Sequence, residues 1–296
     1  MIDFTRMFYN DKSRLEAFVL NPVNFETVDA VMEYHTGEVK YPYKTKLGIM
    51  DVGISEKSGY VKNSLHKLYN HNTIGEDQNH NDFSYSSLCK TIDFMSKKII
   101  DVDSTRLTQL EFGLNIKVDR RPEDIVRRNI IMHQHKGGSS NDYRGRGELK
   151  QFCHNNYIIK CYDKGKQYQL NDNILRIEIK FIKAVEFNKL GIYNIGDLKS
   201  KLLLRNLFLY LIKRFDELII MDDIDELSIP IKKEYDKLSR YNNPNFWSEE
   251  LKGVHPQKRA RHKKEFNSLL EKNDLLKTKA FLRKSLYKKF FYLINI

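Results

Sequence analysis

Cysteine is scarce in this 296-residue sequence, and its spacing is uninformative for metal binding. The three residues, Cys89, Cys153 and Cys161, form no CxxC or CxxxH pattern. An odd number without such spacing argues against a disulfide framework and against a thiolate zinc site. We therefore expect a protein of a reducing, cytoplasmic compartment.

Long apolar runs are also lacking. The most apolar stretch, residues 202–212, is interrupted by Arg205 and Asn206 and falls short of the roughly 20 residues that a bilayer requires. Near the N-terminus, Asp3 and Arg6 stand where a secretion signal would need its apolar segment. These absences predict a soluble protein with no membrane partner.

Neither internal repeats nor long low-complexity linkers interrupt the chain. Its hydrophobic content of 41% is enough for an ordinary core, in one large domain or two smaller ones. The chain is basic, with 51 Lys and Arg against 39 Asp and Glu, and residues 251–296 alone hold 13 Lys or Arg against three acidic residues. This distribution favours a polyanionic partner, nucleic acid before membrane.

The first 192 residues show mixed patterns of strands and helices. Strands are predicted at 27–36, 46–55, 106–118, 157–164 and 174–182, and helices at 84–99 and 122–134. A glycine-rich stretch, 136–147, is predicted to be a mobile loop beside the last two strands. This order of elements predicts an α+β domain with an antiparallel sheet.

From residue 193 onward the apolar period becomes helical. Four helices are expected, at 197–220, 228–240, 256–272 and 275–294, with Trp247 in a turn that anchors one helix to another. We therefore predict two domains, an α+β catalytic domain over 1–192 and a basic, helical DNA-binding domain over 193–296.

Residues 157–181 predict a hairpin in which one face of each strand is polar. Alternation directs six charged or phenolic side chains to that face: Lys160, Tyr162, Lys164, Arg176, Glu178 and Lys180. The opposite face is apolar, so we expect it to lie in the hydrophobic core. Such a polar face is compatible with ordinary cross-strand charge pairs as well as with a functional site. For Glu178, a salt bridge to Lys160 or Lys164 stays an open alternative.

Four segments in order carry a resemblance to a known family: "SLHKLYNHNTIG" (64–75), "LTQLEFGLNI" (107–116), "IIKCYDKG" (158–165) and "ILRIEIKFIKAVEFNKLGI" (174–192). Together they resemble the gene II type replication initiators of filamentous phages and related rolling-circle plasmids. The resemblance implies a DNA endonuclease and strand transferase that starts replication by nicking and rejoining one DNA strand.

The resemblance also implies roles for individual residues. Tyr162 aligns with the nucleophile that forms a 5′-phosphotyrosine link, and Lys164 would lower its pKa or balance charge in the transition state. Glu111 and Glu178 align with acidic residues on neighbouring strands, which predicts a Mg²⁺ or Mn²⁺ site. Asn115, Arg176 and His71 are auxiliary candidates. Arg176 would hold either a phosphate or the carboxylate of Glu111. The blander reading of His71 is a loop histidine bonded to backbone.

The remaining candidates concern DNA binding. Arg144 and Arg146 lie in the glycine-rich stretch, and a basic run at 257–266 offers Lys258, Arg259, Arg261, Lys263 and Lys264 as phosphate contacts. His133 and His135 resemble a metal-binding pair, but Gln134 between them and a predicted helix end argue against that use.

The expected partners are origin DNA, as a duplex or hairpin, and the single strand that follows nicking. A host helicase or polymerase in a bacterial cytoplasm and a homodimer are further expectations. Two alternatives stay open: a noncatalytic DNA-binding repressor or partition protein, and a relaxase or transposase of related chemistry.

Overall fold

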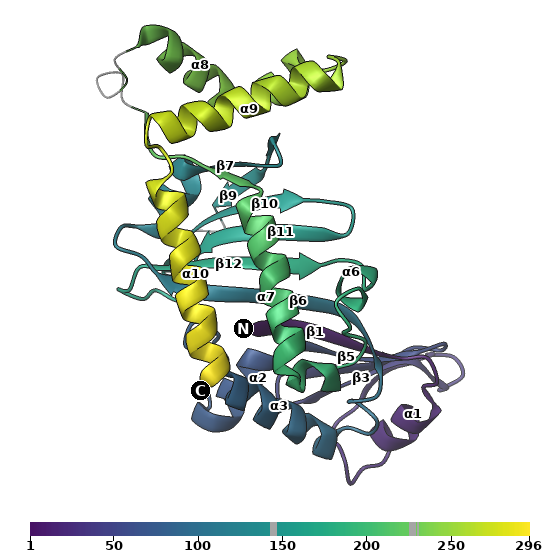
Figure 1. The fold of residues 1–296 in the computed structure, drawn as a ribbon. Coiled ribbons are helices and arrows are strands. Elements are labelled where there is room, and N and C mark those ends of the chain that lie inside the picture. The colour runs from purple at the N-terminus through teal and green to yellow at the C-terminus, as the bar shows by residue number, and fades with distance from the viewer. Residues whose placement is uncertain (143–146, 225–228, 230) are drawn as a thin grey trace.

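A large antiparallel sheet forms the centre of the computed structural model, which describes residues 1–142, 147–224, 229 and 231–296 (Figure 1). Within that part of the chain the sheet has ten strands, in the order β2-β3-β4-β5-β1-β6-β12-β11-β10-β9. Their bounds are β1 Ile2–Tyr9, β2 Asp29–Met32, β3 Val39–Leu47, β4 Met50–Ile54, β5 Gly59–Ser64, β6 Arg106–Lys117, β9 Ser139–Asp142, β10 Glu148–Cys153, β11 Tyr157–Asp163 and β12 Ile174–Phe181.

One face of this sheet is apolar and covered by helices α7 (Lys201–Asp216) and α10 (Lys277–Asn295). Phe112 of β6 meets Phe290 of α10, and Phe181 of β12 meets Tyr210 of α7. Because strand side chains alternate, the neighbours of these residues point to the opposite side. We call that opposite side the open face.

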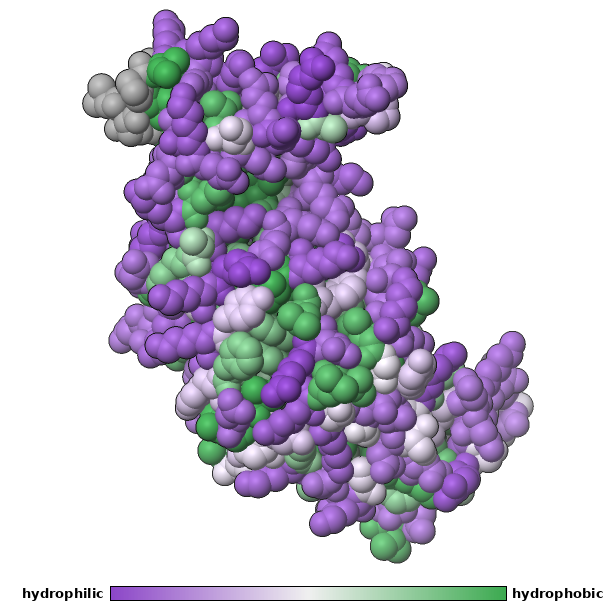
Figure 2. Space-filling view, in the orientation of Figure 1, coloured by the Kyte–Doolittle hydropathy of each residue, from purple (hydrophilic) through white to green (hydrophobic). Residues whose placement is uncertain are grey.

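A second, smaller core lies at one end of the molecule (Figure 1). It is built by a three-stranded sheet, β13 (Leu218–Ile220), β7 (Ile130–His133) and β8 (Lys136–Gly137), with α8 (Lys232–Asn242), η3 (Phe246–Glu250) and α9 (Pro256–Lys272). Trp247 is fully buried there, donates to the carbonyl of Tyr241 at 2.7 Å and packs on Phe266, so the predicted anchor is confirmed. Hydrophilic residues cover most of this end in Figure 2.

Short helices complete the fold: α1 Ser13–Val19, α2 Leu65–Ile74, α3 Tyr85–Lys98, α4 Pro122–Asp124, η1 Ile125–Asn129, α5 Lys164–Gln167, α6 Val185–Asn188 and η2 Gly196–Lys199. Ser64, Ser84 and Asp163 begin α2, α3 and α5 as N-caps, each accepting a backbone N–H with its side chain. No helix of the described residues is long and apolar enough to cross a membrane.

The predicted α+β class with an antiparallel sheet is confirmed. The strands at 106–118, 157–164 and 174–182 and the helices at 84–99 and 256–272 match within one or two residues. The predicted strand at 46–55 is instead the end of β3 and the whole of β4, because Gly48 turns the chain with φ +55°.

Three other predictions were wrong in part. The helix predicted at 197–220 spans only Lys201–Asp216, and Leu218–Ile220 form strand β13. The helix predicted at 122–134 ends at residue 129, and the following Ile130–His133 pairs with β13 as a strand. The glycine-rich stretch forms β8 and β9 before it reaches residues 143–146, which lie outside the described residues. The division between residues 192 and 193 stays a prediction, with α7 and α10 packed on the main sheet and α8 and α9 around the second core.

Candidate active site

Three strands from distant parts of the sequence bring the predicted site residues together. Strand β12 pairs with β6 on one side and with β11 on the other, which sets Glu178 opposite Gly113 and Lys160, and Arg176 opposite Asn115 and Tyr162. The pairing expected from the sequence is therefore confirmed. Leu175, Ile177, Ile179 and Phe181 are fully buried on the helical side, so the polar residues between them occupy the open face.

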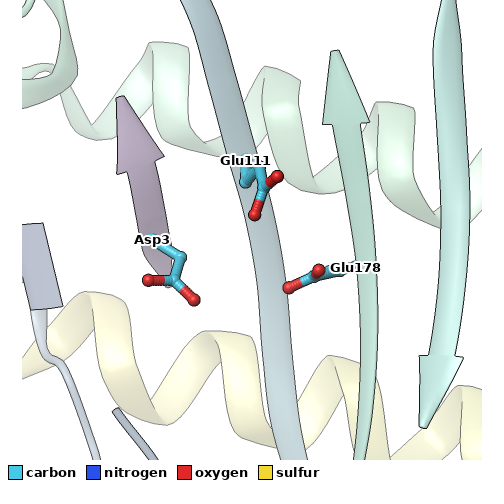
Figure 3. A group of neighbouring side chains, drawn as sticks. All are labelled: Asp3, Glu111 and Glu178. Atoms are coloured by element: carbon cyan, nitrogen blue, oxygen red, sulfur yellow. The ribbon is translucent and has the colours of Figure 1, made fainter. Parts of the chain in front are cut away.

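Three carboxylates lie at the centre of this face: Asp3 of β1, Glu111 of β6 and Glu178 of β12 (Figure 3). Each contributes an oxygen within 4.8 Å of the other two. Glu111 and Glu178 were predicted from the sequence, whereas Asp3 was not. Strand β1 positions it because β1 lies directly beside β6.

Gly113 lets Glu178 occupy its place. A Cβ at residue 113 would lie 2.3 Å from the Cβ of Glu178, which no real pair of carbon atoms tolerates. The glycine in "LEFGLNI" therefore has a steric reason, since only a residue without a side chain fits opposite this glutamate.

Cations neutralise much of the acidic charge. Arg176, only 2% exposed, donates from Nε to Glu178 Oε2 at 2.6 Å and from Nη2 to Asp3 Oδ2 at 3.2 Å. Lys160 Nζ lies 3.0 Å from Glu178 Oε1 and 3.4 Å from Glu111 Oε1, and Lys180 also reaches Glu111 at 3.2 Å. The salt bridge left open for Glu178 exists, and it coexists with the carboxylate cluster.

The auxiliary candidates have different places. Asn115 Oδ1 accepts from Arg176 Nη1 at 2.9 Å while its amide donates to the carbonyls of Asn79 and His80, so it orients the arginine. Arg176 is directed to Glu178, Asn115 and Asp3 rather than to Glu111. His71, at the end of α2, pairs with the exposed Asp77 at 2.8 Å and lies outside the carboxylate cluster.

Tyr162 lies at the edge of the cluster, with its hydroxyl 3.4 Å from Glu178 Oε2. It is partly buried and lines a pocket of about 300 Å³, together with Gly147, Leu149, Gln151, Lys160, Asp163, Gln167 and Glu178. The pocket gives a reactant access to the phenol and to a carboxylate at once. Burial, followed by the charge of Glu178, raises the pKa of Tyr162 well above its usual value of 10.

Lys164 is buried as the first residue of α5, rather than a strand residue, with its Nζ 5.5 Å from the centre of the Tyr162 ring. Burial, and then the charge of Arg176, lowers the pKa of Lys164 to about 7. The expectation that Lys164 lowers the pKa of Tyr162 does not fit this arrangement, because burial and Glu178 raise that pKa. That Lys164 balances charge in the transition state stays a prediction. A lysine with so low a pKa can be neutral near pH 7 and can then accept a proton.

The carboxylates differ in acidity. Burial opposes the ionisation of Glu178, but Lys160 and Arg176 outweigh it and lower its pKa to about 2. Glu111 has the opposite shift, since burial and the neighbouring Glu178 raise its pKa. At neutral pH the cluster therefore holds at least one firmly ionised carboxylate.

The donor set fits a hard divalent ion. Mg²⁺ and Mn²⁺ prefer carboxylate oxygens, and three of them lie close enough to share one ion. Among the described residues, the cations that contact Glu111 both reach its Oε1.

The predicted DNA-binding residues of α9 fall into two groups. Lys258, Arg261 and Lys264 are exposed and follow one side of the helix. Arg259 instead donates to the carbonyl of Trp247 at 2.6 Å, and Lys263 lines a cleft against His135. Arg144 and Arg146 lie outside the described residues.

The two histidines judged not to be a metal pair have separate neighbours. His133 ends β7, is fully buried and is hydrogen bonded to His154 at 2.8 Å. His135 packs against Trp247.

Sequence reasoning missed Asp3 and the groups that hold it. Asn79 donates to Asp3 Oδ2 at 2.7 Å, Ser64 donates to Oδ1, and Tyr168 donates to Asn79 at 2.6 Å. The signal available was "IDFTRMFY", whose alternation predicts a strand with an acidic residue near its start. Nothing local reveals that this strand lies in the middle of the sheet.

Comparison with solved structures gives a weak likeness. A solved structure of a rolling circle replication initiator protein from Geobacillus stearothermophilus is similar to this chain at 14% sequence identity and a TM-score of 0.36, over 70% of this chain and 84% of that one. No family model matches the sequence, and no curated protein matches it significantly. A likeness of this strength identifies neither a family nor an activity.

Proposed function

We propose that this chain initiates rolling-circle replication by nicking and rejoining one DNA strand through Tyr162. The observation that carries the proposal is the position of the Tyr162 hydroxyl, 3.4 Å from a carboxylate of a three-carboxylate cluster and beside an open pocket. The four segments that resemble gene II type initiators support the same reading, since three of them supply the strands that carry Tyr162, Glu111 and Glu178.

In the proposed reaction, the Tyr162 oxygen attacks a phosphorus atom of the DNA backbone and forms a phosphotyrosine ester. The bond to the 3′ oxygen breaks, and that oxygen leaves as a hydroxyl after taking a proton. Reversal of the same step rejoins the strand, because the ester conserves the energy of the broken bond.

The residues of the site divide the remaining work. The phenol must lose its proton, and we assign that transfer to Lys164, because its Nζ lies 5.5 Å from the centre of the Tyr162 ring and burial lowers its pKa. Glu178 is too weak a base for this purpose, since Lys160 and Arg176 hold its pKa near 2. Lys160 faces the pocket and places a positive charge where phosphate oxygens would lie.

Asp3, Glu111 and Glu178 would hold Mg²⁺ or Mn²⁺. A bound divalent ion polarises a phosphoryl oxygen and stabilises the charge that develops during the exchange. Arg176 and Asn115 would act behind this layer by fixing the orientation of Glu178 and Asp3.

The test uses tiled single-stranded oligonucleotides from the replicon that encodes the chain, incubated with Mn²⁺ and resolved on a denaturing gel. The wild-type chain should form a covalent adduct with one of them, and Tyr162→Phe should form none while still binding DNA. Tyr157→Phe is the matched control, because Tyr157 lies on the same strand and packs against His154 away from the carboxylates.

Three outcomes contradict the proposal in different ways. An adduct that survives Tyr162→Phe rules out this nucleophile. Binding without any adduct favours the noncatalytic DNA-binding reading. An adduct confined to a transfer origin or an element end favours the relaxase or transposase reading.

A further inference from the structure

Aromatic rings and cations continue across the open face beyond the carboxylate cluster. Phe4 and Phe8 of β1 and Tyr60 of β5 are partly exposed there. The ring of Tyr60 lies flat over the neighbouring strand, since a Cβ on Gly53 would be 2.4 Å from its Cζ atom. These rings are presented to solvent rather than to the helical core.

The strand registers arrange these side chains in two rows that run across the sheet. Arg6 is opposite Lys62, Lys62 is opposite Asp51, and Asp51 is opposite Lys46. In the next row, Phe8 is opposite Arg106 and Tyr60, and Gly53 lies between Tyr60 and Lys44. We call these two rows, with Phe4, the aromatic–basic track.

The cations of the track lack acidic partners. No ion pair within 4.0 Å joins Arg6, Lys44, Lys46, Lys62 or Arg106 to a carboxylate of the described residues, although Asp51 lies among them. The Nε of Arg6 is buried and has no hydrogen-bond partner there. Like charges on neighbouring strands destabilise a sheet, so an external anion would relieve the repulsion.

The cations contact the rings instead. Arg6 lies 4.9 Å and Lys62 5.1 Å from the centre of the Tyr60 ring, and Arg106 lies 5.4 Å from that of Phe8. Lys180 lies 5.8 Å from the ring of Phe4 and also pairs with Glu111, which joins the track to the carboxylate cluster. The track and the candidate active site therefore form one continuous surface.

We propose that the aromatic–basic track binds the single-stranded DNA that flanks the nick, an inference that rests on the proposed function. Exposed rings beside unpaired cations suit unstacked bases joined by phosphates, because bases stack on rings while lysine and arginine contact the backbone. A duplex would present its phosphates but keep its bases inside, so it would leave the rings unused. From β6 to β3 the track crosses four strand spacings, about 19 Å.

The test measures anisotropy of a fluorescein-labelled 20-nucleotide oligothymidine over a salt series. Every variant is made in the Tyr162→Phe chain, so that no covalent adduct contributes. Lys44→Gln, Lys46→Gln and Lys62→Gln together should flatten the slope of log affinity against log salt by about 2, since each phosphate contact on a single strand contributes about 0.7. Lys90→Gln, Lys97→Gln and Lys98→Gln on helix α3 are the matched control, because these lysines are exposed and lie on a helix rather than on the open face.

Tyr60→Leu should weaken binding by about 5- to 150-fold and leave the salt slope unchanged, as expected for loss of one base stack. Phe8→Leu provides a second variant if Tyr60→Leu lowers thermal stability. Equal effects of the track and α3 triple variants would overturn the inference, and so would an equal loss on a 20-base-pair duplex. Failure of the wild-type chain to form an adduct, with the track result intact, would count against the proposed function alone.

Discussion

Replacement of Glu178 by glutamine tests the centre of the candidate site. Lys160 and Arg176 lower the pKa of Glu178 from 4.5 to about 2, which corresponds to about 3 kcal/mol of stability at pH 7. Removal of one partner from a buried ion pair typically costs about 3 to 5 kcal/mol. Both values agree, so we expect Glu178→Gln to lose about 3 kcal/mol.

The assay is urea unfolding at pH 7 followed by far-ultraviolet circular dichroism. With a urea dependence of about 3 kcal/mol per molar, the midpoint should fall by about 1 M. Fluorescence of Trp247, the sole tryptophan, reports the second core and should change less. Glu250→Gln is the control, because its partner Arg240 is exposed and such pairs contribute little.

The pH dependence has a definite sign. Because the pKa of Glu178 is lower in the folded chain, its contribution is complete above pH 4.5 and is lost as the pH falls toward 2. The difference between the wild-type chain and Glu178→Gln should therefore stay constant from pH 7 to about 5 and shrink below that. A difference under 1 kcal/mol at pH 7 would refute the ion-pair geometry.

Manganese supplies a separate arm of the same experiment. An ion at 100 times its dissociation constant stabilises a folded protein by about 2.7 kcal/mol. Mn²⁺ should stabilise the wild-type chain and stabilise Glu178→Gln much less. Equal stabilisation of the wild-type chain and Glu178→Gln would show that the ion binds elsewhere. The difference in stability measured without Mn²⁺ would still stand.

Three further predictions concern other parts of the chain. Lys164→Met should stabilise the protein at pH 6 by on the order of 4 kcal/mol, because it removes a buried ammonium group. This gain should shrink as the pH rises from about 7 toward 10.5, since the folded protein then holds Lys164 in its neutral form. Thermal melts across this pH range measure the difference. Glutamine at Lys258, Arg261 and Lys264 should flatten the salt slope of duplex binding by about 2.7, and an unchanged slope would exclude this side of α9. Arg259→Ala should instead lower stability by about 1 to 2 kcal/mol, because the hydrogen bond from Arg259 to the Trp247 carbonyl is lost. Unfolding monitored by Trp247 fluorescence measures this loss. A loss of DNA affinity without a loss of stability would contradict the structural role of Arg259.

Local patterns predicted the part of the fold that depends on alternation. Apolar and polar residues alternate over 159–162 in β11 and over 175–181 in β12, so the faces of Tyr162 and Glu178 could be assigned without knowing their neighbours. Ile130–His133 could not be assigned in this way, since its apolar residues suit a helix or a strand and only pairing with β13 decides.

The missing part of the site depends on long-range pairing. Asp3 approaches Glu111 because β1 enters between β5 and β6, and no local pattern reports that order. Two of the acceptors that bind the guanidinium of Arg176 belong to Asn115 and Asp3, which lie 61 and 173 residues away in the sequence. Residue types and alternation predicted which side chains share the open face, whereas the arrangement of ion pairs required the sheet.

The order of strands in the sheet has a consequence for synthesis on the ribosome. Strands β1 and β5 can pair early, but the carboxylate of Asp3 gains Arg176, and that of Glu111 gains Lys180, only when β12 has emerged from the exit tunnel. A nascent chain that ends before residue 176 would have the acidic residues of β1 and β6 without the guanidinium that pairs with Asp3 and without Glu178 beside Tyr162. Under the proposed function, translation products that end before residue 176 would therefore be unable to cut DNA.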